Sequence, residues 1–270
     1  MSIKLIAIDI DGTLLNSERM ITPRVNEAIQ KARQQGVYVV LCTGRPLPGV
    51  QDQLQELDLI NDRDFVVTYN GSLVQRTGDG HTYCHFTLDY SDLEEVAKQA
   101  KHHPIHFHAI DQEVIHVTTE DIGEYSYHEH QLVNMPISHK PQEEIDPTSE
   151  FTKMMFVEKA ELLEPFIAQL PTSFTEKYTL LRSAPYYLEV LNKDASKGKA
   201  VAKLAEILGL TSDEIMCLGD NENDMDMITY AGMGVAMGNA VESVKKVANF
   251  ITATNDEDGV AVAIEKFVLS

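Results

Sequence analysis

Short apolar runs rich in β-branched residues recur in the first part of the chain, with an amphipathic stretch between the first two. The runs are Lys4–Ile10, Val37–Cys42 and Phe65–Tyr69, and such runs are typical of strands buried on both faces of a sheet. Between the first two, the pattern predicts a helix over Pro23–Gln35 with Thr22 as its N-cap. Strands that alternate with helices indicate a parallel, doubly wound α/β sheet.

This alternation is interrupted in the middle of the chain. Residues 88–186 mix helical runs with short strands, and the α/β rhythm returns afterwards with a helix over Ser196–Leu208. The sequence therefore predicts a Rossmann-like core formed by residues 1–83 and 189–270. It also predicts that residues 84–188 form a separate α+β domain inserted into that core as a cap.

Composition and charge narrow the classes of partner. Of the 270 residues, 43% are hydrophobic and 24% are charged, as in ordinary globular proteins. The net charge of −20 argues against nucleic acid or anionic lipid as a partner. The sequence shows no membrane-spanning stretch, no signal peptide and no disulfide framework among its three cysteines, so we expect a cytoplasmic protein. A monomer and a homodimer both remain open.

The run Asp9-Ile10-Asp11-Gly12-Thr13 lies where the first predicted strand ends. In open α/β sheets, binding sites form just beyond the carboxyl ends of the strands. Of two carboxylates placed there, one can attack a substrate while the other handles the proton of the leaving group. The alternative is a solvated turn, because Asp and Gly are common turn residues.

A second acidic run, residues 219–224, follows the apolar stretch Ile215–Leu218. If the two strands are neighbours, carboxylates from both runs meet at one edge of the sheet, namely Asp9, Asp11, Asp220 and Asp224. Such a convergence requires a cation, and oxygen ligands with open positions suit Mg²⁺. A calcium EF-hand does not fit, because the run lacks the Gly at loop position six and the Glu at position twelve.

Two further signals suit a phosphate group. Thr43-Gly44-Arg45 follows a predicted strand, and its hydroxyl and backbone amides could hold phosphate oxygens. Lys197 opens a predicted helix, where its ammonium could neutralise a phosphate and an attacking carboxylate. Each signal is weak alone, and the information lies in their order along the chain.

His106 and His108 alternate in the inserted region and would share one face of a strand. A metal site, contact with substrate and simple packing are the three interpretations, and the spacing fixes no third metal ligand.

The four motifs, in this order and with an insertion between the second and the third, resemble the haloacid dehalogenase (HAD) superfamily. Asn70-Gly71 and the ending 255–261 are similar to its Cof-type branch with a C2 cap. The resemblance implies that Asp9 is the nucleophile and Asp11 the general acid and base. The other roles that it implies are phosphate binding by Thr43, Gly44, Lys197 and Asn223, and Mg²⁺ binding by Asp9, the main-chain oxygen of Asp11, Asp220 and, in support, Asp224.

The sequence thus predicts a Mg²⁺-dependent phosphoric monoester hydrolase that acts on small phosphorylated metabolites, sugar phosphates first, through an aspartyl-phosphate on Asp9. Phosphate-bearing cofactors remain possible substrates, and no motif names the physiological one. Two alternatives stay open. A phosphomutase could use the same nucleophile, and a non-enzymatic signalling receiver also accepts a phosphoryl group beside Mg²⁺.

Overall fold

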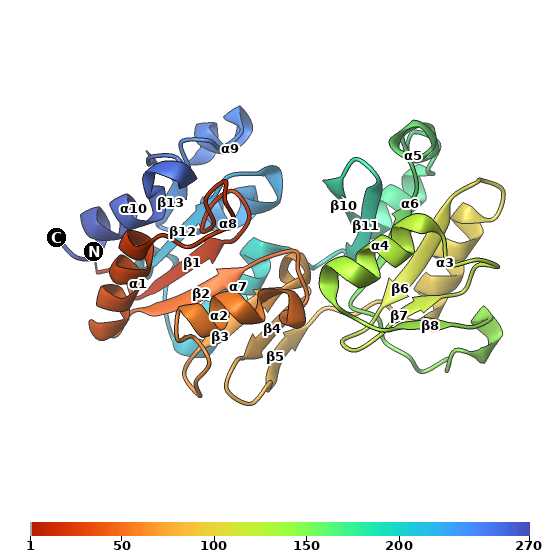
Figure 1. Ribbon diagram of the computed structural model, residues 1–270, viewed down its shortest axis with the longest axis horizontal. Helices are drawn as coiled ribbons and strands as arrows, with labels where there is room; N and C mark the ends of the chain where they lie inside the picture. Colours follow the sequence, from red (N-terminus) through yellow and green to blue (C-terminus); the bar gives the residue numbers. More distant parts are fainter. Residues whose placement is uncertain (1) are drawn as a thin grey trace. The chain divides into compact units, whose positions relative to one another are not determined.

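The strands of the computed structural model, which describes residues 2–270, form two separate sheets (Figure 1). The chain divides accordingly into two units. The first comprises the segment up to Gly44, Val50–Cys84 and Ser196–Ser270, and the second comprises Arg45–Gly49 and His85–Ala195.

The sheet of the first unit has eight strands, and β1 lies near its middle. In spatial order they are β14 (Phe250–Ile251), β13 (Met233–Ala236), β12 (Ile215–Gly219), β1 (Leu5–Asp9), β2 (Tyr38–Cys42), β3 (Phe65–Thr68), β4 (Leu73–Arg76) and β5 (Thr82–His85). Neighbours from β14 to β3 pair in parallel, whereas β4 pairs antiparallel with β3. The predicted α/β class with a doubly wound parallel core is confirmed.

Apolar side chains on both faces of this sheet are covered. Leu5 and Ala7 belong to a core cluster with Val201 of helix α7, and Ile6 and Ile8 on the opposite face are also fully buried. This double burial explains the continuous apolar run in the sequence. The helices of the unit are α1 (Pro23–Gln34), α2 (Gln51–Glu56), α7 (Lys197–Leu208), α8 (Met225–Tyr230), α9 (Glu242–Val247) and α10 (Gly259–Phe267).

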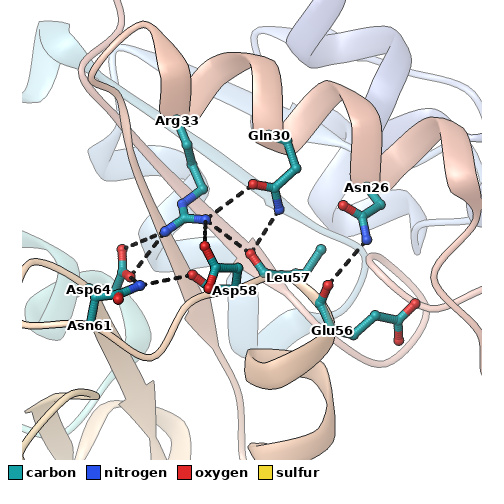
Figure 2. A network of polar contacts seen from close by, with 8 residues as sticks. All are labelled: Asn26, Gln30, Arg33, Glu56, Leu57, Asp58, Asn61 and Asp64. Atoms are coloured by element: carbon teal, nitrogen blue, oxygen red, sulfur yellow. Dashed lines mark hydrogen bonds and ion pairs between the residues drawn. The ribbon is translucent and has the colours of Figure 1, made fainter.

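Helix α1 begins and ends within one residue of its prediction, and its last turns are tied to the loop before β3. The Thr22 hydroxyl accepts a hydrogen bond from the Val25 amide, as an N-cap does. Arg33 donates to the Leu57 carbonyl at 3.2 Å and to Asp64 at 3.1 Å (Figure 2). One guanidinium thus connects two segments of the loop between α2 and β3 to the same helix.

The second unit carries a six-stranded sheet with its own helices. In spatial order the strands are β10 (Tyr178–Ala184), β11 (Tyr187–Asn192), β9 (Lys153–Val157), β6 (His106–Ile110), β7 (Ile115–Val117) and β8 (Ile137–His139). All neighbours pair antiparallel except β7 and β8. The helices are α3 (Tyr90–Ala100), α4 (Glu124–Val133), α5 (Ala160–Ile167) and α6 (Thr172–Lys177). Phe107, Met154 and Phe156 form its core with Leu93 of α3 and Leu163 of α5.

A buried polar cluster lies between this sheet and α4. His108 is fully buried, and its Nδ1 is 2.9 Å from the Ser126 hydroxyl. Lys153 of β9 donates to Glu129 of α4 at 3.3 Å and to Glu189 of β11 at 3.4 Å. These contacts hold α4 on the sheet through charges and hydrogen bonds, which suits a helix with few apolar side chains.

The neighbouring His106 lies between two carboxylates. Its ring nitrogens lie 3.0 Å from Glu158 and 2.7 Å from Asp121. Within residues 2–270, neither this histidine nor His108 belongs to a group of three side chains placed to hold a metal ion. The burial of His108 and the carboxylate contacts of His106 support the packed interpretation of the pair. The three cysteines are free thiols. None of the helices formed by residues 2–270 has the length and apolar character required to cross a bilayer.

Burial of His108 makes the second unit sensitive to acid. Burial, and then the nearby Lys153 charge, lower the pKa of His108 to about 3, against about 6.5 in an unfolded chain. Between these values the unfolded state binds a proton that the native state does not bind. We therefore expect this histidine to lower the free energy of unfolding by up to about 1.4 kcal/mol for each pH unit below about 6.5.

The measurement is urea denaturation of wild-type protein and His108→Gln at pH 7.5 and pH 5.5. His102→Gln, at an exposed position, is the control and should keep the wild-type dependence. If the free energy of unfolding falls between pH 7.5 and pH 5.5 by as much in His108→Gln as in wild-type protein, another group causes the acid sensitivity.

Candidate active site

The carboxyl ends of three neighbouring strands bring the predicted residues to one edge of the first sheet. Ile8 of β1 pairs with Leu218 of β12 on one side and with Leu41 of β2 on the other. The residues that follow these strands therefore emerge together. Strands β2 to β5 lie on one side of β1, and the later strands β12 to β14 lie on the other. The strand order thus reverses at β1, and ligands bind at such switch points.

Lys197 is buried between two carboxylates at this edge. Its ammonium lies 2.5 Å from Asp9 Oδ1 and 2.6 Å from Asp224 Oδ1. The lysine and both acids are at most 6% exposed. Lys197 is the first residue of α7, where the Ser196 hydroxyl caps the helix by accepting from the Lys199 amide. The start of the helix thus fixes the position of the ammonium.

Asp224 also holds the loop that carries Asp220. Its Oδ2 accepts hydrogen bonds from the amides of Asp220 at 3.0 Å and Asn221 at 3.1 Å. Asp220 in turn accepts from the Thr13 hydroxyl at 2.9 Å. The two acidic runs, far apart in the sequence, are therefore joined by direct contacts.

Gly12 allows this approach of the two loops. Its φ of +83° lies in the left-handed region, and a Cβ there would come within 2.6 Å of Asp220 Oδ2. Its carbonyl accepts a hydrogen bond of 2.8 Å from Asn239. The sequence did not predict the contact of Asn239 with Gly12, because Asn239 lies in a loop after β13 that carries no acidic or phosphate-binding motif.

Asp9, Asp220 and Asp224 form a group suited to a hard cation. Each offers a carboxylate oxygen, and these oxygens lie within 4.8 Å of one another. Oxygen donors alone fit Mg²⁺ better than zinc or copper. The side chain of Asp11 lies outside this group and is exposed.

The charges of the group do not cancel. Burial, and then the Asp224 carboxylate, raise the pKa of Asp9 well above its usual range, although Lys197 opposes them. Burial and Asp224 likewise raise the pKa of Asp220 to about 6. Burial lowers the pKa of Lys197, but Asp224 and Asp9 outweigh it and raise that pKa overall. Three carboxylates against one ammonium leave an excess of negative charge that a bound divalent cation would neutralise.

The predicted phosphate-binding residues gather beside this group. Thr43 is buried and its amide donates to the Val67 carbonyl at 2.9 Å. Gly44 packs closely against the side chain of Asn70, and Asn223 donates to the same side chain at 3.1 Å. The structure thus brings Thr43, Gly44 and Asn223 together around Asn70, a residue to which the sequence assigns no role. The chemical roles of all these residues stay predictions.

Lys197 should stabilise the fold itself. Lys197→Met leaves Asp9 and Asp224 buried without their counter-ion, so we expect the free energy of unfolding to fall by about 3 kcal/mol. The matched control is Lys203→Met, which changes a half-exposed side chain of the same helix and should leave the free energy of unfolding near that of the wild-type protein. Chemical denaturation at pH 7 without added metal measures both. Equal, small effects in the two variants would contradict the role of Lys197 as the neutralising charge.

Comparison with known proteins supports one family. The sequence profile of haloacid dehalogenase-like hydrolases matches residues 6–264. The chain is 43% identical to "Putative phosphatase YxeH" of Bacillus subtilis (strain 168), over 99% of each sequence. It is 34% identical to the 5-amino-6-(5-phospho-D-ribitylamino)uracil phosphatase YcsE of the same strain, over 100% of this chain and 97% of that protein.

Solved structures agree with this result. A haloacid dehalogenase-like hydrolase from Bacteroides thetaiotaomicron has a TM-score of 0.86 and 34% identity, covering 98% of this chain and 99% of that one. A sugar phosphatase of HAD subclass IIB has a TM-score of 0.79 and 26% identity, covering 98% of each chain.

Proposed function

Because this chain belongs to the haloacid dehalogenase-like hydrolases, a family in which its relatives carry the names of phosphatases, we propose that it is a Mg²⁺-dependent phosphatase with Asp9 as its nucleophile. The observation that supports this most is the buried group of Asp9, Lys197, Asp220 and Asp224 at the carboxyl ends of β1 and β12. It offers one reactive carboxylate, one fixed ammonium and a set of oxygen ligands for a cation.

The two half-reactions use this chain's own groups. A carboxylate oxygen of Asp9 attacks the phosphorus, and the bond from phosphorus to the ester oxygen breaks as the carboxyl group of Asp11 gives that oxygen a proton. The ionised Asp11 then takes a proton from water, whose oxygen attacks the phosphorus and releases phosphate from Asp9. Lys197 opposes the rise in the pKa of Asp9 that burial causes, and it balances charge on the phosphoryl oxygens.

Mg²⁺, held by Asp9, Asp220 and the main-chain oxygen of Asp11 with Asp224 in support, would neutralise the negative charge shared by the phosphate and its attacking carboxylate. Thr43, Gly44 and Asn223 orient the phosphoryl group through hydroxyl, backbone and amide donors. The predicted insertion, residues 84–188, selects the remainder of the substrate.

The substrates that we propose are phosphate monoesters of sugars and related polyols. Two relatives support this class, since one is named a sugar phosphatase and the other acts, by its name, on a phosphorylated ribityl chain. Product analysis separates this function from the alternatives. Free phosphate released over many turnovers indicates a phosphatase, an isomeric sugar phosphate indicates a mutase, and a long-lived phosphoprotein after a single turnover indicates a receiver.

Asp9→Asn should abolish turnover and leave the fold intact, because the side chain keeps its shape but loses its nucleophilic charge. We expect kcat to fall by at least about 1000-fold in an assay of phosphate release from a panel of sugar phosphates with Mg²⁺. Asp213→Asn, at an exposed position of the same unit, is the control. A wild-type rate in Asp9→Asn would refute the mechanism.

Asp220→Asn should weaken the cation site specifically. Loss of one ligand charge should raise the Mg²⁺ concentration for half-maximal activity by about tenfold or more, and excess chelator should stop the wild-type enzyme reversibly. Glu222→Gln, exposed in the same loop, should leave the Mg²⁺ dependence unchanged. Activity that survives the chelator undiminished would rule out the cation.

A further inference from the structure

Three consecutive buried residues adopt left-handed backbone conformations directly after β3. The φ angles are 51° at Tyr69, 54° at Asn70 and 95° at Gly71, and both non-glycine residues are at most 3% exposed. Positions of this kind cost about 1–3 kcal/mol for a residue other than glycine, and they persist only where the surroundings fix them. Such strain concentrates at functional sites.

The contacts of Asn70 show what fixes this turn. Its amide donates to the Thr43 carbonyl at 2.8 Å, and its side-chain Oδ1 accepts from Asn223 Nδ2 at 3.1 Å. Gly44 lies so close that a Cβ there would be 2.9 Å from Asn70 Nδ2. One asparagine therefore contacts, through backbone and side chain, two of the three segments that are predicted to bind phosphate.

The next residue extends this contact to the start of α7. A Cβ on Gly71 would lie 2.1 Å from the Ser196 carbonyl and 2.7 Å from the Lys197 amide, so only glycine fits. The turn therefore touches the backbone of the residue that supplies the ammonium, as well as the loops after β2 and β12.

We propose that Asn70 is a positioning residue for phosphoryl transfer, an inference that rests on the function proposed above. Its Oδ1 takes one of the two amide hydrogens of Asn223, which fixes the orientation of that amide and leaves the second hydrogen to donate to a phosphate oxygen. Its backbone and side chain together hold Thr43-Gly44 in place. The strain of the turn is thus the cost of placing one amide between two binding loops.

Asn70→Gly tests this with little disturbance of the backbone, because glycine accepts the same φ. We expect kcat/KM on a sugar phosphate to fall about tenfold or more, with the thermal midpoint near that of the control. The matched control is Asn134→Gly, which removes an exposed asparagine that also has a left-handed φ, of 52°, at the end of α4. It should keep wild-type kinetics.

A double-mutant cycle with Asn223→Ala separates positioning from a general structural effect. If Asn70 acts through Asn223, the kcat/KM of the double variant should be no more than about threefold below that of the less active single variant. Losses that multiply, or an Asn70→Gly variant within twofold of wild-type kcat/KM, would overturn the inference.

A second substitution at the same position tests the inference if Asn70→Gly folds poorly. Asn70→Asp tolerates the left-handed conformation but adds a negative charge beside the phosphate-binding groups, so KM should rise by about tenfold or more. A wild-type KM in this variant would overturn the inference as well. Absence of turnover in the folded wild-type enzyme itself would instead refute the proposed function, so the two failures are distinguishable.

Discussion

The ion pairs of Lys197 with two buried carboxylates are the constraint on which the first unit depends. Carboxylates at the carboxyl ends of adjacent strands are brought together by the sheet itself, and without a cation they would repel one another in a poorly solvated position. Lys197 solves this only in part, because Asp220 remains beyond its direct contacts. The same arrangement, which is costly in the protein alone, would favour the metal ion and the phosphate that we propose to bind there.

The location of this lysine follows from the helix that it begins. Residues at the first turn of α7 lie at the positive end of the helix dipole, which favours nearby anions. The Gly198 amide, one residue on, donates to Asp226 at 2.9 Å. The helix terminus and the ammonium thus both attract carboxylates, and a lysine placed elsewhere on the helix could not contact both Asp9 and Asp224.

Much of the site could be predicted from the sequence, because the residues that follow neighbouring parallel strands lie at the same edge of the sheet. The motifs of Asp9 and Asp220 each follow an apolar run, and neighbouring parallel strands bring such ends together. Asn70 and Asn239 could not be placed in the same way, since their contacts arise from loop conformations that periodicity does not describe. In the second unit, the sequence pattern predicts a mixture of helices and strands but does not locate α4, whose Tyr and His residues are weak helix formers, or the hairpin of β10 and β11. Pro185 lies in the turn of that hairpin, and the exposed Arg182 and Ser183 interrupt the apolar pattern of β10.

Strand β14, which closes one side of the larger sheet, contains only two residues, Phe250–Ile251. An exposed edge strand offers unpaired amides and carbonyls to any other chain that approaches it, and a long one invites association into β-aggregates. Two residues provide too few hydrogen bonds to hold an added strand. The strong mutual repulsion of molecules that each carry a net charge of −20 acts in the same direction. This margin of the larger sheet therefore offers little for the edge of another sheet to pair with.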